Sequence, residues 1–89
     1  MKIKEGFKLR TVGKEHIVTA EGLQQVDFNK LIALNPSAAY LWQAVDGQEF
    51  DVQTLANLLT AKYDVSRQQA LADATHIVNS WFEAGIIEE

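Results

Sequence analysis

A well-marked helix start divides this sequence into two halves with different apolar patterns. Asn35 is a favourable N-cap residue, and Pro36 follows at the first helical position, where a missing backbone N–H leaves no hydrogen bond unmade. Apolar side chains then recur at i, i+3, i+4 and i+7 until Asp46-Gly47, which is a helix-ending pair. Before Asn35, apolar residues come in short bursts rich in β-formers. The chain is therefore expected to fold as strands followed by helices.

Three segments before this helix have the patterns of β-strands. Residues 7–13 alternate apolar and basic side chains over four positions, and Gly13-Lys14 predicts a tight turn into a partner strand at 15–20. A polar loop over residues 21–27 leads to a third strand at 28–34. The second half of this third strand is apolar on both faces, so we expect it to be covered more fully than the first two.

Two further helices follow. The second is predicted to begin at the N-cap residue Asp51, with Phe50 and Leu55 placed as a hydrophobic staple. The third begins at Ser66 and ends at Ala84-Gly85 in the left-handed manner, after which Ile86-Ile87 should fold back onto the core. The apolar stripe of the third helix consists of Ala70, Leu71, Ala74, Ile77, Val78, Trp81 and Phe82.

The predicted architecture is one α+β domain over residues 1–89, with a three-stranded antiparallel sheet followed by a three-helix bundle. At this size neither half can bury its apolar face alone, so the two must pack together. Trp42 and Trp81 are expected to meet at the centre of the helices.

Composition excludes several classes of function. The absence of cysteine rules out disulfides and thiolate metal sites and fits a reducing cytoplasm. The N-terminal residues lack the apolar core of a signal peptide, and no stretch approaches the ~18 apolar residues of a membrane span. His16 and His76 lie sixty residues apart without a metal-ligand spacing, and His76 with Asp73 is read as a surface pair. We therefore expect neither an enzyme nor a bound cofactor or metal.

The third strand is the remaining candidate for a functional site. In a meander it forms one edge of the sheet, and Leu31 to Leu34 hold neither charge nor proline to prevent pairing with another chain. An open edge beside a helix would bind a peptide by strand addition. Alternatively, the third helix covers the edge outright, and the pattern alone leaves both possibilities open.

The order and spacing of several short motifs resemble the PqqD family, whose members take part in pyrroloquinoline quinone biosynthesis and related pathways. The resemblance covers nearly the whole chain and rests on Leu34-Asn35, Ala38-Ala39, Leu41-Trp42, Val45-Asp46-Gly47, Leu55, Leu58-Leu59, Tyr63-Asp64-Val65, Ala70, Asp73, Ile77, Trp81 and Gly85-Ile86-Ile87. It implies a fold similar to a winged helix-turn-helix. It also implies a non-catalytic chaperone that binds the leader of a ribosomally made precursor peptide and presents it to a modifying enzyme, often a radical S-adenosylmethionine (SAM) protein.

By the same resemblance, the leader would add as a strand to the third strand and lie beside the third helix. The corresponding strand residues are Asn29, Lys30, Leu31, Ile32, Ala33 and Leu34. The helix flank that we predict as the groove wall consists of Leu71, Thr75 and Val78, although the sequence does not distinguish this flank from the opposite one.

Two alternatives to a peptide chaperone remain. A winged-helix DNA-binding regulator shares the helical layout, but residues 35–89 contain two basic against eight acidic residues, which disfavours contact with phosphates. A structural domain could instead self-associate, forming a homodimer through the same strand edge or by swapping a terminal element.

Overall fold

The computed structural model describes residues 1–20 and 31–89, and it confirms the α+β order of strands followed by helices. Two predictions, the loop over 21–27 and the beginning of the third strand at 28–30, lie outside the described residues. The elements are β1 (Lys2–Ile3), β2 (Phe7–Val12), β3 (Glu15–Ala20), β4 (Leu31–Leu34), α1 (Pro36–Val45), α2 (Val52–Lys62), α3 (Arg67–Ala84) and β5 (Ile87–Glu88).

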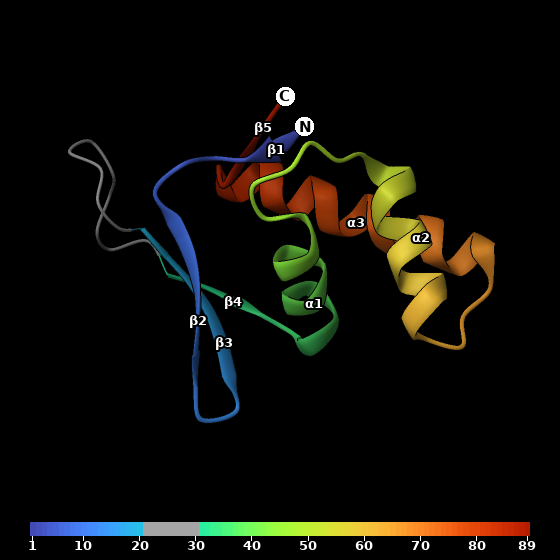
Figure 1. Cartoon of the computed structure of the whole chain (residues 1–89), viewed down its shortest axis with the longest axis horizontal. Coiled ribbons are helices and arrows are strands. Elements are labelled where there is room, and N and C mark those ends of the chain that lie inside the picture. The colour runs from blue at the N-terminus through green and yellow to red at the C-terminus, as the bar shows by residue number, and fades with distance from the viewer. Residues whose placement is uncertain (21–30) are drawn as a thin grey trace.

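Strands β2, β3 and β4 form an antiparallel sheet in that order, so β4 is an edge strand, as the meander predicts. Gly13 adopts a φ of 62° in the turn between β2 and β3, a conformation that glycine reaches without steric cost. His16 lies opposite Leu34, and Val18 lies opposite Ile32. Figure 1 shows that β4 leads directly into α1, so the sheet edge and the helices are joined without a long connection.

The two faces of the sheet differ sharply. Val18 is fully buried, and its cross-strand neighbours Leu9 and Ile32 pack partly buried against the helical core. On the opposite face, Arg10 and Ala33 are exposed. The third strand was expected to be covered more fully than the first two; Ile32 and Leu34 are partly or fully buried, but Ala33 is exposed because the described helices pack on one face of the sheet.

Each helix begins at the residue that its local sequence predicts. The side-chain oxygen of Asn35 accepts a hydrogen bond from the backbone N–H of Ala38 at 2.8 Å. Ser66 caps α3 in the same way through the N–H of Gln69 at 3.0 Å. Gly85 ends α3 with a φ of 76°, the left-handed cap that the sequence predicts. These caps satisfy N–H groups that would otherwise lack a partner, which fixes the helix boundaries locally.

Aromatic rings fill the centre of the core. The rings of Trp42 and Trp81 meet edge to face with centroids 5.4 Å apart, as predicted, and Phe50 packs on Trp81 at 6.3 Å. Both tryptophans are almost completely buried. Phe82, predicted as part of the apolar stripe of α3, is instead 37% exposed, because it lies on the flank of the helix away from the core centre.

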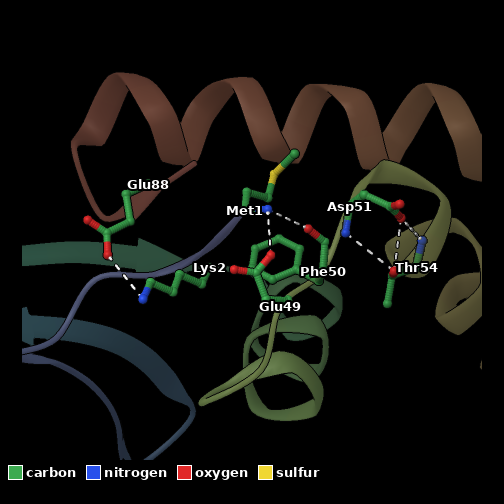
Figure 2. A network of polar contacts seen from close by, with 7 residues as sticks. All are labelled: Met1, Lys2, Glu49, Phe50, Asp51, Thr54 and Glu88. Atoms are coloured by element: carbon green, nitrogen blue, oxygen red, sulfur yellow. Dashed lines mark hydrogen bonds and ion pairs between the residues drawn. The ribbon is translucent and has the colours of Figure 1, made fainter.

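The two ends of the described chain meet in a second, two-stranded sheet that the sequence analysis missed. β1 pairs with β5, and Ile87 is buried, which confirms that the C-terminal segment folds back. Figure 2 shows that the amino group of Met1 donates a hydrogen bond to the carbonyl oxygen of Phe50 at 2.9 Å and lies 3.6 Å from Glu49. These contacts tie the segment between α1 and α2 to the β1–β5 pair.

The polar network of Figure 2 continues to the start of α2. The carboxylate of Asp51 accepts hydrogen bonds from the backbone N–H of Thr54 at 2.8 Å and from its hydroxyl at 2.9 Å. The backbone N–H of Asp51 donates in return to the Oγ1 of Thr54 at 3.3 Å, which completes a capping box. Hydrogen bonds to the charged carboxylate hold the pKa of Asp51 below its ordinary value of 3.8, the backbone bond from Thr54 contributing most.

Candidate functional site

A shallow hollow of about 190 Å³ runs between β4 and α3, and we call it the strand hollow. Its lining consists of Ile32, Ala33, Leu34, Asn35, Ala38, His76, Ile77, Ser80 and Trp81. Successive side chains of a strand point to opposite faces, so a hollow that touches three consecutive residues of β4 lies along the edge of the strand. The helix therefore lies beside this edge and leaves a space between them.

Edge position gives β4 a capacity for further pairing. Among the described residues, β4 is paired with β3 alone, so one side of its backbone faces away from the sheet. The N–H and C=O groups on such a side can bond to an added strand. The side chains beside them, Ile32 and Ala33, are uncharged, so nothing in the described part of β4 repels an incoming chain.

A second and larger hollow of about 430 Å³ adjoins the first, and we call it the helix hollow. It lies past the end of β4, where α1 begins, and is bounded by α1, the C-terminal part of α2 and the middle of α3. Its lining consists of Asn35, Ser37, Leu59, Tyr63, Val65, Asp73, His76 and Ile77. Asn35, His76 and Ile77 line both hollows, so the two lie side by side along α3 and together form the depression considered below.

The strand residues predicted as the site divide into three groups. Ile32, Ala33 and Leu34 line the strand hollow, as expected of an edge beside α3. Leu31 belongs to β4 by its backbone. Asn29 and Lys30 lie outside the described residues.

The helix residues predicted as the groove wall are absent from the lining of both hollows. Leu71, Thr75 and Val78 line neither hollow; Val78 is buried in the core, and the hydroxyl of Thr75 donates to the carbonyl oxygen of Leu71 at 2.8 Å. The α3 residues that line the strand hollow together with β4 are His76, Ile77, Ser80 and Trp81, and Asp73 lines the helix hollow past the end of the strand. Asp73, His76, Ile77 and Ser80 recur at i, i+3, i+4 and i+7, so the sequence shows that they share one flank of α3. The apolar stripe has two flanks, however, and the local sequence does not indicate which of them faces β4.

The charge around the depression is unsuited to nucleic acid. Arg67 is the basic residue of α3, and its guanidinium donates to Asn57 and Gln53 of α2, which holds it at the helix–helix contact. Asp73 adds a carboxylate to the lining of the helix hollow. A recognition helix for DNA needs several cations at groove-facing positions, so the DNA-binding alternative gains no support from the described residues.

Residues 1–20 and 31–89 contain neither a candidate metal site nor a candidate membrane span. No group of three histidine or acidic side chains in these ranges could hold a metal ion. No helix in the same ranges is both long enough and apolar enough to cross a bilayer.

Comparison with known proteins shows that the sequence matches one protein family. The family model described as coenzyme PQQ synthesis protein D (PqqD) matches residues 15–87, which include β3, β4, all three helices and the first residue of β5. None of the curated proteins matches the sequence.

One solved structure shares the fold over almost its full length. It is described as TbiB1 in complex with the TbiA(beta) leader peptide, and it superposes with a TM-score of 0.76, covering 99% of this chain and 95% of that chain. The two sequences are 16% identical, so the likeness concerns the fold.

Proposed function

The chain belongs to the PqqD family, and from this premise we propose that it is a non-catalytic chaperone for a ribosomally made precursor peptide. The leader of that peptide would add as a strand to the free edge of β4 and lie in the strand hollow against α3. TbiB1, which has the same fold, was solved with a leader peptide, and this supports a peptide as the ligand class.

The observation that carries the proposal is the open edge of β4 beside a hollow. Backbone pairing would supply affinity with little dependence on sequence, and the hollow would select side chains and thereby fix the register. Strand addition suits the described site because Ile32 and Leu34 face the core and hold β4 in place, while its outer side stays available.

Peptide binding is tested by NMR titration with a synthetic leader peptide from a precursor of this kind. We expect the backbone amide signals of residues 29–34 to shift first, followed by those of His76, Ile77 and Ser80. Shifts confined to Lys8–Arg10 on the far strand would contradict the proposal.

Strand addition itself is tested by methylating the peptide's backbone nitrogens one at a time. Alternate amides of an added strand bond to its neighbour, so every second methylation should weaken binding by about two- to tenfold. Methylations between them should have little effect. A uniform response along the peptide would exclude strand addition even if the peptide binds.

We further propose that the bound leader is presented to a peptide-modifying enzyme, of the radical SAM type, in the cytoplasm. A modification assay with that enzyme and the full precursor should proceed faster when this protein is added. The same edge could pair two copies of the chain as a homodimer, which light scattering over a range of concentrations would detect. If so, the leader should dissociate the dimer, because both compete for β4.

A further inference from the structure

The helix hollow has an apolar floor and a charged rim, a combination that the proposed strand pairing does not use. Leu59 is buried in its floor, and Tyr63, Val65 and Ile77 are half-buried around it. Asp73 contributes a carboxylate to the rim. An occupant that matched both parts would need a long apolar stem and a polar end.

The polar groups of this rim favour a cation. Asp73 is the sole carboxylate among the lining residues, and neither lysine nor arginine is among them. Its Oδ1 accepts a hydrogen bond from Gln69 at 2.8 Å, an uncharged donor that leaves the negative charge in place. The hydroxyl of Ser37, which also lines the hollow, donates to the Oδ1 of Asn35 at 3.0 Å, so its oxygen keeps the capacity to accept a hydrogen bond.

The lysine nearest to Asp73 along the sequence, Lys62, is not part of the lining of the helix hollow. The Nζ of Lys62 lies 4.2 Å from the ring centroid of Tyr40 and 6.0 Å from that of Tyr63, and Lys62 does not line the hollow. The shorter of these contacts joins Lys62 to Tyr40, which is outside the lining of the hollow, whereas Tyr63 belongs to that lining. The negative charge of the rim is therefore matched by no lysine or arginine that lines the hollow.

We propose that the helix hollow binds a lysine or arginine side chain of the same peptide, located just past the residues that pair with β4. This inference rests on the proposed function, because it requires the peptide to follow β4 beyond Leu34, where Asn35 and His76 join the two hollows. The aliphatic stem would pack on Tyr63 and Ile77, and the charged end would reach Asp73. The hollow thus selects a basic residue at one position of the leader.

The test uses a random peptide library displayed on phage, selected separately against the unchanged protein and two variants. Asp73→Asn removes the charge and keeps an oxygen for Gln69. Glu83→Gln removes another exposed negative charge of α3 that lines neither hollow, and it serves as the matched control. One selected peptide and its version with the basic residue replaced by glutamine are then titrated against all three proteins.

We expect peptides selected by the unchanged protein and by Glu83→Gln to share a lysine or arginine at one position outside the paired segment. Selection by Asp73→Asn should lose this preference, and replacing the basic residue should weaken binding about two- to fivefold only when Asp73 is present. Peptides that shift the amide signals of β4 but show no basic preference, or prefer an aromatic residue there, would overturn this inference alone. Failure to select any peptide that shifts those signals would overturn the proposed function.

Discussion

The two flanks of α3 can be told apart by placing the same bulky side chain on each. Ser80 is exposed and lines the strand hollow, whereas Thr75 is exposed on the opposite flank and lines neither hollow. An indole at Ser80 would project into a space of about 190 Å³ that the leader must enter. We predict that Ser80→Trp abolishes tight peptide binding and that Thr75→Trp, the matched control, does not.

The size of the effect follows from the length of the exposed edge. β4 has four residues, and alternate residues of an edge strand direct their N–H and C=O outward, so about four backbone groups are available to an added strand. Each hydrogen bond contributes about 0.5–1.5 kcal/mol net, or about 2–6 kcal/mol together. Preventing the pairing should therefore raise Kd by a factor of at least about 30.

Fluorescence anisotropy with a labelled leader peptide measures both dissociation constants. Serine, threonine and tryptophan have similar helix propensities, so both variants should unfold within about 0.5 kcal/mol of the unchanged protein. Urea denaturation checks this point. If Thr75→Trp weakened binding and Ser80→Trp did not, the wall would be the flank of Leu71, Thr75 and Val78, and the argument from the hollow would be refuted.

Three further predictions concern the scaffold. Trp81→Ala should lower the free energy of unfolding by about 3–5 kcal/mol, because it removes a ring that contacts both Trp42 and Phe50; an effect under about 1 kcal/mol in urea denaturation would contradict this packing. Gly85→Ala should cost about 1 kcal/mol, since its φ of 76° strains any residue with a Cβ, and an unchanged melting temperature would argue against the left-handed cap. Asp51 has a lowered pKa in the folded protein, so its stabilising contribution is present above pH 3.8 and should be lost as pH falls through the folded pKa; melting temperatures measured against pH should show a smaller acid loss for Asp51→Ala, and identical curves would contradict the linkage.

The local sequence was sufficient to predict where the helices begin, because the capping interactions join residues only a few positions apart. Asn35, Asp51 and Ser66 each satisfy an N–H group three positions along the chain, so the information lies within one turn. The β1–β5 pair was missed for the opposite reason. Lys2 and Glu88 lie at opposite ends of the chain, and two-residue strands have no periodicity by which to recognise them.

Which residues of α3 face β4 depends on the rotation of the helix about its own axis, and the local sequence does not specify this rotation. Residues on both flanks of the α3 stripe are spaced correctly for a groove wall, so periodicity identifies the buried centre and leaves the choice of flank to tertiary packing. Two contacts fix how α3 is rotated and where it lies: the ring packing of Trp81 against Trp42, and the hydrogen bonds from Arg67 to α2. This rotation turns Ile77 and Ser80 toward β4 and leaves Thr75 on the far flank. The same core contacts that stabilise the fold therefore decide which side chains a peptide on β4 would meet, so substitutions that alter this packing should change peptide selectivity even where they touch neither hollow.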